Sequence, residues 1–155
     1  MESDEVIRIY TYSTTNKMNV KKLLLVIMIL FYLLAGYNHF ANPEFYYPLI
    51  PPYLSAWSGS INILSGIIEI LLALMLIPKA TRKAAAWGIM LMLIAFIPSH
   101  IYFIQKGIFQ LGPIEVTPAI AWLRLLVVHP MLLLWAWYIA RTDQIVPIVT
   151  AGVKN

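Results

Sequence analysis

Four polar side chains recur at helical spacing within an otherwise apolar stretch of the chain. They are Ser58, Asn62, Ser65 and Glu69. At about 100° per residue, all four fall on one narrow stripe of a helix. A carboxyl group inside a membrane span is costly, and it marks either a structural ion pair or a role in binding or proton movement. The stripe is therefore predicted to face the interior of a helix bundle.

Arg124 and His129 are the charged or titratable residues of the last apolar stretch. Arginine keeps its charge and needs a nearby anion, so Glu69 is its expected partner. His129 is the alternative partner, because a helix rise of about 1.5 Å per residue places it closer to the depth of Glu69. On an ideal helix Arg124 and His129 point about 140° apart, which leaves one of them free to face a neighbouring subunit of a homo-oligomer.

Two further histidines lie near the ends of apolar stretches. Asn38 and His39 close the first stretch, and His100 follows Pro98, which frees a backbone carbonyl and bends a helix. These residues predict a small-ligand cavity in the outer half of the bundle, with Glu69 and His129 as a deeper floor. The candidate ligand-binding residues are Asn38, His39, Asn62, Ser65, Glu69, His100, Arg124 and His129.

The same side chains suggest the class of ligand. Imidazole, amide and guanidinium groups beside an apolar channel suit the head of a quinone. His39 and His100 lie at similar predicted depth, as the axial ligands of a b-type haem would, but nothing in their spacing requires haem. The chain has no cysteine, which excludes disulfides, thiolate nucleophiles and cysteine-held metal centres. No metal site and no basic nucleic-acid surface is predicted, and no catalytic residue is assigned.

A membrane domain must position these residues. Of 155 residues, 61% are hydrophobic and 12% are charged, whereas soluble domains average roughly 25% charged residues. A membrane helix needs about 20 mostly apolar residues, and four stretches qualify, at 23–40, 56–77, 84–104 and 118–140. The predicted fold class is all-α: a four-transmembrane-helix bundle in residues 23–140, with a loosely held N-terminal arm at 1–22 and a tail at 141–155.

Lysine and arginine residues outside the spans lie almost entirely on one side of this bundle. One side carries Arg8, Lys17, Lys21, Lys22, Lys79, Arg82, Lys83, Arg141 and Lys154. The opposite side carries Lys106 alone. Because cytoplasmic loops carry the excess of lysine and arginine, both termini are predicted to be cytoplasmic, in the plasma or inner membrane of the cell.

The connection between the first two spans, "ANPEFYYPLIPPYLS", is unusually apolar for a loop. Its four prolines disfavour an α-helix, and its tyrosines suit the depth of lipid headgroups. Two interpretations remain open. The segment is either a lid over the mouth of the bundle or a simple interfacial anchor.

The sequence resembles the DoxX family over residues 23–138. The resemblance is carried by "AGYNHFANPEFYYPLIPPYL", by Ser65-Gly66 with Glu69, by Ala85-Ala86-Trp87-Gly88, and by "WLRLLVVHPMLLLWAWY". It implies a membrane bundle of four helices with a loose association with redox chemistry. Some relatives are membrane subunits of quinone-linked sulfur oxidoreductases, or partners of thiol and superoxide defence proteins.

The resemblance marks four polar positions of this chain as family-specific: Asn38, His39, Glu69 and Arg124. Two segments depart from the usual pattern of the family. Pro98-Ser99-His100 stands where relatives commonly have Pro-Ala-Asn, and Leu125 to Val128 replaces the Leu-Pro-Leu-Gln that commonly follows the arginine.

Three functions are compatible with these features. The leading prediction is a non-catalytic membrane subunit of a quinone-linked redox system, in which an oxidoreductase partner or a bound cofactor supplies the electrons. The first alternative is a small proton-coupled transporter, in which burial of the Glu69 carboxyl favours proton exchange near neutral pH. The second alternative is a membrane scaffold that recruits a soluble enzyme through the Pro78–Lys83 loop.

Overall fold

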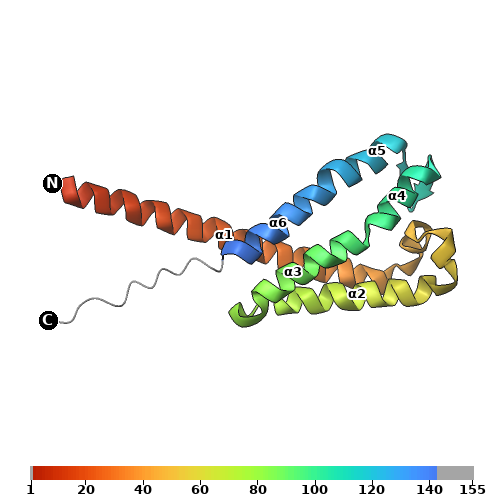
Figure 1. The fold of residues 1–155 in the computed structure, drawn as a ribbon, viewed down its shortest axis with the longest axis horizontal. Helices are drawn as coiled ribbons and strands as arrows, with labels where there is room; N and C mark the ends of the chain where they lie inside the picture. Colours follow the sequence, from red (N-terminus) through yellow and green to blue (C-terminus); the bar gives the residue numbers. More distant parts are fainter. Residues whose placement is uncertain (1, 143–155) are drawn as a thin grey trace.

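The computed structural model describes residues 2–142, with side chains described for residues 20–141. Long helices dominate it (Figure 1). In chain order they are α1 (Glu2–Ala41), α2 (Ser58–Met75), α3 (Lys79–Ala95), α4 (Ile97–Lys106), α5 (Pro118–Leu123), the π-helical turn η4 (Arg124–Val128) and α6 (His129–Thr142).

The prediction of four membrane-spanning helices is confirmed. Four helical segments are long and apolar enough to cross a membrane: Val20–Ala41, Pro52–Met75, Lys79–Lys106 and Pro118–Arg141. Their bounds differ from the predicted ones by only a few residues. The protein is therefore a membrane protein with four candidate spans.

The third span is divided by Pro98. Helix α3 ends at Ala95 and α4 begins at Ile97, with Phe96 between them. Since proline has no N–H to donate, the helical hydrogen-bond ladder is interrupted just before it, as the sequence predicts. Figure 1 shows that α3 and α4 consequently meet at an angle.

The predicted N-terminal arm is helical from Glu2 onward. Helix α1 begins at Glu2, so residues 2–22 continue the helix of the first span. The physical reason is that no glycine or proline occurs before Gly36, and a helix nucleated in the span extends at little cost. The tail at 143–155 lies outside the described residues.

Two connections at the same end of the molecule contain short regular structure. The α1–α2 connection forms three 3₁₀ helices with proline in their first turn, η1 (Pro43–Phe45), η2 (Tyr47–Leu49) and η3 (Pro52–Trp57). The α4–α5 connection forms an antiparallel hairpin of β1 (Phe109–Leu111) and β2 (Ile114–Val116). Gly112, with φ of 58°, supplies the positive φ that a two-residue hairpin turn needs. The all-α prediction missed this hairpin.

The helices pack as two pairs. Helix α1 lies mainly against α2, and α3 lies mainly against α6, while α2 and α3 join the pairs. The larger apolar core lies between these helices, around Met28, Leu76, Ile89 and Ile139. A smaller core joins the α1–α2 connection, α4, the hairpin and α5 through Leu49, Phe103, Leu111, Val116 and Ala121.

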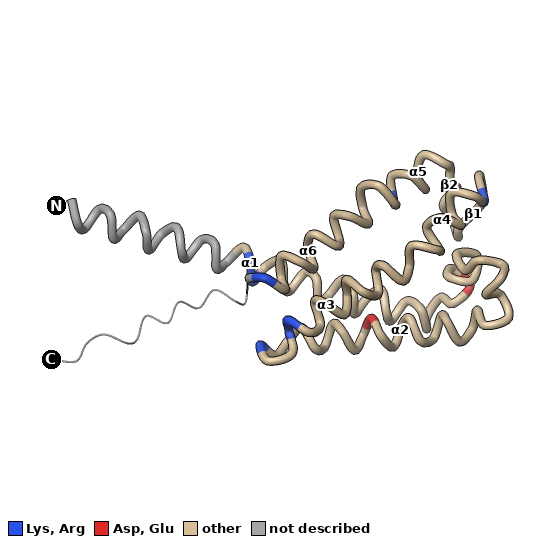
Figure 2. Tube along the Cα trace, viewed as in Figure 1, with Lys and Arg blue, Asp and Glu red and all other residues tan. Residues whose placement is uncertain are grey.

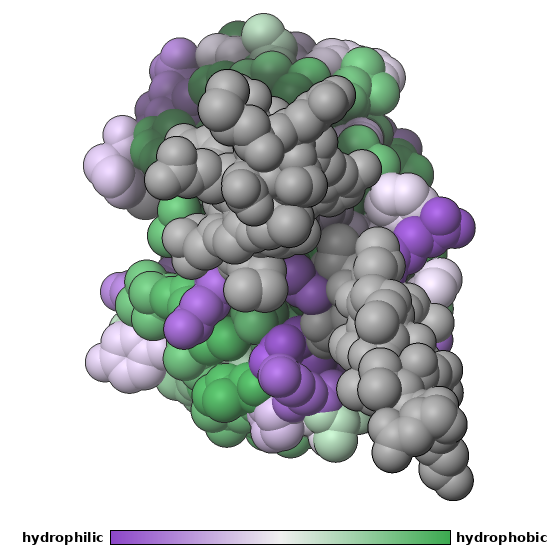
Figure 3. All heavy atoms as spheres, turned by 90° about the vertical axis from the view of Figure 1, so that its left-hand side faces the viewer, coloured by the Kyte–Doolittle hydropathy of each residue, from purple (hydrophilic) through white to green (hydrophobic). Residues whose placement is uncertain are grey.

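The charged residues divide along the long axis of the molecule. Figure 2 shows blue segments at the end that carries the α2–α3 turn, and one blue segment at the hairpin end. Figure 3 views the first of these ends directly and shows hydrophilic residues gathered beside hydrophobic ones. Lys21 and Lys22 lie at the start of the first span, Lys79, Arg82 and Lys83 at the start of the third, and Arg141 at the end of the fourth. Lys106 ends the third span at the hairpin, and Arg124 lies within the fourth.

The α2–α3 turn uses two of its polar side chains to close α2. Thr81 Oγ1 donates to the Met75 carbonyl over 2.6 Å, and Arg82 donates to the carbonyls of Leu76 and Ile77 over 2.9 and 2.8 Å. These bonds satisfy backbone oxygens that the end of a helix leaves open. Arg82 therefore has a structural role in addition to its contribution to the charge asymmetry.

Candidate functional site: a lid-covered cavity between two polar walls

Two glycines bring α1 and α2 into close contact. A Cβ atom at Gly36 would lie 2.8 Å from the Gly66 carbonyl oxygen, and one at Gly66 would lie 2.9 Å from that of Gly36. No larger residue fits at either position while the backbones stay this close. Gly59, seven residues before Gly66 on α2, has open space around it instead.

This crossing joins three polar groups into one network. His39 lies three residues after Gly36, and Glu69 lies three residues after Gly66, so both extend from the point of contact. His39 Nδ1 lies 2.7 Å from Asn62 Oδ1, and Asn62 Nδ2 donates to the His39 carbonyl over 2.8 Å. His39 Nε2 lies 3.7 Å from Glu69 Oε2. We call His39, Asn62 and Glu69 the α1–α2 pole.

Tyr46 connects this pole to the α1–α2 connection. Its ring stacks on that of His39, with centroids 3.6 Å apart and planes 19° apart. Asn38 Nδ2 donates to the Tyr46 hydroxyl over 2.9 Å, and that hydroxyl donates to the Ala35 carbonyl over 3.4 Å. A tyrosine hydroxyl is protonated at neutral pH, and burial raises the pKa of Tyr46 further above its ordinary value.

The π-helical turn η4 changes the direction of the fourth span's polar residues. The His129 N–H bonds to the Arg124 carbonyl, five residues earlier, which brings the two residues closer to one face than an α-helix would. Both contact α4: the Arg124 guanidinium carbon lies 4.8 Å from the Phe103 ring centre, and the His129 and His100 rings lie 4.6 Å apart. The structure thus gives no support for one of them facing a neighbouring subunit.

Neither predicted partner of Glu69 is close to it. The ion-pair partner of Glu69 among the described residues is His39, and neither Arg124 nor His129 reaches it. The reason is geometric, because α1 is the helix that packs against α2 at this depth, while Arg124 and His129 pack against α4. Both predicted pairings are therefore wrong. We call His100 and Arg124 the α4–η4 pole.

A cavity of about 850 Å³ separates the two poles. Its walls are mostly apolar, and the polar residues that line it are His39, Tyr46, Tyr53, Asn62, Ser65, Glu69, Ser99, His100 and Arg124. Tyr46, Leu49, Ile50, Pro51, Tyr53 and Leu54 of the α1–α2 connection also line it. This placement favours the lid over the interfacial anchor, and we call residues 43–57 the lid.

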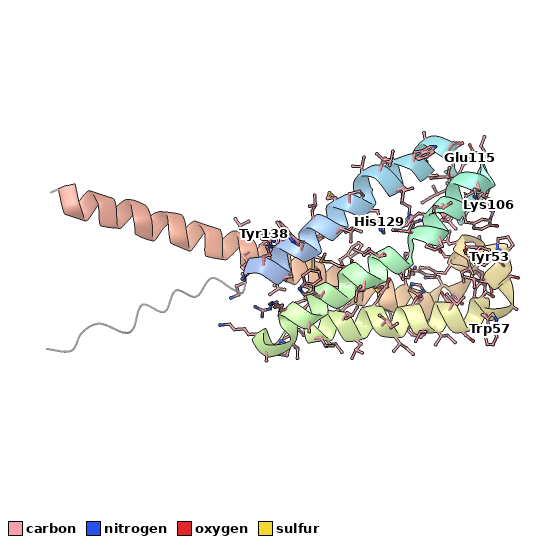
Figure 4. All side chains as sticks on the ribbon, in the orientation of Figure 1. Tyr53, Trp57, Lys106, Glu115, His129 and Tyr138 are labelled. Carbon is pink, nitrogen blue, oxygen red and sulfur yellow. The ribbon has the colours of Figure 1, made fainter. Side chains whose placement is uncertain are left out.

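The cavity collects six of the eight predicted site residues. The residues that line it are His39, Asn62, Ser65, Glu69, His100 and Arg124. Asn38 and His129 do not line it but contact residues that do. Asn38 holds Tyr46, and His129 holds the edge of the His100 ring. Figure 4 shows His129 on the side of the fourth span that faces α3 and α4, and Tyr53 and Trp57 at the lid end.

Sequence reasoning missed three residues that shape the site. Gly36 sets the α1–α2 contact, Tyr46 covers His39, and Phe103 supports Arg124. A signal for the first was present, because Gly36 with His39 and Gly66 with Glu69 share the same three-residue spacing. The other two depend on the path of the lid and on the π-helical turn, for which the sequence carries no evident signal.

Residues 28–140 match the family model described as a domain of unknown function, DUF8561. No curated protein and no solved structure matches the chain. The match covers both poles, the lid and the four spans except for residues 20–27 of the first and Arg141 of the fourth, so the chain belongs to the DUF8561 family.

Proposed function

We propose that the protein is a membrane subunit or accessory of a redox system and that it binds a quinone-class ligand in the lid-covered cavity. The observation that carries the proposal is a cavity of about 850 Å³ with apolar walls and polar groups at two separate poles. Pockets for small organic ligands span roughly 300–1,000 Å³ and combine apolar walls with a few polar groups. The resemblance to the DoxX family supplies the redox association.

The residues present suit a quinone head. Such a ring carries two carbonyl oxygens on opposite sides, and each accepts hydrogen bonds. Ser65 and the His39–Glu69 pair supply polar groups on one wall, and His100 with Arg124 supplies N–H donors on the other. The ring lies between them against apolar side chains. In this proposal the quinone supplies the redox chemistry, and an oxidoreductase partner supplies the electrons.

The charge asymmetry supports an orientation for this proposal. Six of the eight lysine and arginine side chains that the structure describes lie at the end opposite the lid. This supports a proposed orientation with that end and both termini in the cytoplasm and the lid on the outer face of the plasma or inner membrane. Because the chain has no cysteine, cysteines introduced singly at Lys83 and Gln110 test this directly. An impermeant maleimide should label only the second in intact cells, and the reverse pattern would contradict the orientation.

The ligand is tested by purification and a matched pair of blocking substitutions on α2. Ser65 lines the cavity, whereas Ser60 is exposed and does not. After purification in a mild detergent, extraction and mass spectrometry should find a quinone near one per chain in the unmodified protein and in Ser60→Phe. The quinone should be lost in Ser65→Phe. Quinone no higher than in an unrelated membrane protein from the same cells, or retained by Ser65→Phe, would contradict the proposal.

Proton-coupled transport is the second candidate, and one observation favours it. Glu69 Oε2 is buried and has no hydrogen-bond partner among the described residues, yet it lies 3.7 Å from His39 on the cavity wall. A carboxyl–imidazole pair of this kind can carry a proton on either member. In proteoliposomes containing a pH-sensitive dye, Glu69→Gln should then abolish proton flux, while the exposed Glu115→Gln should not. Equal flux in both variants would exclude this role.

A further inference from the structure

Arg124 carries a charge that the described part of the chain does not neutralise. Its side chain is half-buried within the fourth span and lines the cavity. No carboxylate of the described residues lies within ion-pair distance of it, and its guanidinium rests on the ring of Phe103. Since arginine keeps its proton in proteins, the charge is present whether or not an anion lies beside it.

None of the carboxylates among the described side chains neutralises Arg124. They are Glu44, Glu69 and Glu115. Glu69 is paired with His39 on the other wall, while Glu44 on the lid and Glu115 on the hairpin are exposed and do not line the cavity. A charged group within a span is normally paired or faces a water-filled cavity. Arg124 therefore lies at the cavity without a neutralising carboxylate among the described side chains.

Neighbouring groups can bind an anion together with Arg124. His100 lines the cavity beside Arg124, and a ring N–H of His100 can donate a hydrogen bond to the same anion. His129 packs edge-on against His100, at an interplanar angle of 69°, and holds the His100 ring in place. The π-helical turn begins at Arg124 itself, and such turns recur at functional sites.

The cavity also has a lateral opening for an apolar tail. Leu64 of α2 and Leu91 of α3 both line it, yet they are 57% and 66% exposed on the surface of the molecule. Both lie near the middle of their spans, where the surroundings are lipid. Closer to the cationic end the gap narrows, because a Cβ at Gly88 would lie 2.5 Å from Leu72 Cδ2. The opening between α2 and α3 therefore faces the bilayer interior.

We infer that, in addition to a neutral quinone, the cavity binds an amphiphile with an anionic head, whose acidic group pairs with Arg124 and whose apolar tail extends into the bilayer between Leu64 and Leu91. The chemistry shared by such ligands is a carboxylate or phosphate on a long hydrocarbon. This inference rests on the ligand-binding role of the cavity proposed above, but not on a quinone ring.

The test compares a charged probe with its neutral twin. The full chain is purified in an uncharged maltoside detergent and titrated with 11-(dansylamino)undecanoic acid and with its methyl ester, following dansyl fluorescence. The acid should bind at least about tenfold more tightly than the ester, because a charge-assisted hydrogen bond in a desolvated site contributes that much. Arg124→Gln should abolish the preference, and Arg124→Lys should retain part of it.

Lys83→Gln is the matched control, since Lys83 is an exposed cation of α3 that does not line the cavity, whereas Lys106 donates to the Pro48 carbonyl of the lid. It should keep the full preference for the acid. Competition by dodecanoate and by dodecyl phosphate then identifies the source of the anion, because the tighter competitor shows whether a fatty acid or a lipid phosphate is preferred. Unchanged elution and helix content of Arg124→Gln ensure that a lost preference reports the charge.

Two results would overturn the inference. Equal binding of acid and ester by the unmodified protein, or an acid preference that survives Arg124→Gln, would show that Arg124 is not the receptor. If a quinone and the ester bind while the acid preference is absent, only this inference fails. If neither probe binds and no quinone co-purifies, the cavity is not a ligand site and the proposed function fails with it.

Discussion

The α1–α2 pole and the α4–η4 pole lie on two walls of the cavity, and their polar side chains differ in how many partners they have within the protein. On the α1–α2 wall, the Asn62 amide binds both the ring and the carbonyl of His39, and Glu69 lies beside the same ring. On the α4–η4 wall, Arg124 rests on an aromatic ring and has no ion-pair partner among the described residues. Each side also keeps one buried atom without a hydrogen-bond partner among those residues: Glu69 Oε2 on the first, and Nε2 of His129, behind His100, on the second.

This difference indicates which wall stabilises the fold and which one is available to a ligand. Buried polar groups that satisfy one another stabilise a unique arrangement, whereas unsatisfied ones cost free energy until a partner arrives. We therefore expect substitutions in the α1–α2 wall to affect stability first. Substitutions in the α4–η4 wall should affect ligand selection first and stability little, or even favourably.

The largest effect is expected where the first wall is assembled, at Gly66. In Gly66→Leu the new side chain would meet His39, Phe40 and the Gly36 carbonyl at less than 3 Å, so α1 and α2 must separate. Overpacking typically costs about 1–3 kcal/mol, and more where backbone must move. We expect this variant to aggregate or to lose most of its resistance to heat, as followed by size-exclusion chromatography after heating.

Gly59→Leu provides the matched control for this experiment. It lies one heptad earlier on the same helix, and a Cβ there meets nothing within 4 Å. Its elution after heating should match that of the unmodified protein. If both substitutions are tolerated equally, the α1–α2 contact at Gly66 does not organise the first wall.

A smaller effect is expected at Asn62, which links the two helices by hydrogen bonds. Asn62→Leu keeps the approximate volume but leaves both His39 Nδ1 and the His39 carbonyl without their partner. Each buried polar group that loses its partner costs about 1–3 kcal/mol. The midpoint of unfolding in an SDS titration should fall accordingly, whereas Gln105→Leu, at an exposed amide of α4, should leave it nearly unchanged. An unaltered midpoint in Asn62→Leu would remove the distinction between the walls.

Several features of the structure could be predicted from the sequence alone. The four spans followed from apolar runs of sufficient length, because lipid requires them regardless of packing. The inward direction of Asn62, Ser65 and Glu69 followed from helical periodicity, because α2 is a regular helix. The break at Pro98 followed from the missing N–H. Each of these is a local property of the chain.

The pairing of Glu69 could not be predicted in this way. It depends on which helix crosses α2 at the depth of Glu69, and the Gly36–Gly66 contact makes that helix α1. The directions of Arg124 and His129 depend on the π-helical turn, whereas the predicted angle of about 140° between them assumes an ideal α-helix. The sequence could not decide between a lid and an anchor for the α1–α2 connection, because that choice depends on a tertiary contact, the stacking of Tyr46 on His39 near the end of α1.

The smallest stability effect, and the one of opposite sign, is expected at Arg124. A charged residue at the centre of a span costs about 2.5–3.5 kcal/mol on insertion scales, and part of that cost remains where the residue faces a cavity. Arg124 has no internal anion that offsets it among the described residues. Arg124→Gln should therefore raise the SDS midpoint of the ligand-free protein slightly, by the equivalent of about 1 kcal/mol.

A ligand with an anionic head should stabilise the unmodified protein and leave Arg124→Gln unaffected, because a ligand stabilises only the state that binds it. A fall in the ligand-free midpoint instead would place Arg124 with Asn62, as a residue that holds the fold rather than one held ready for a ligand.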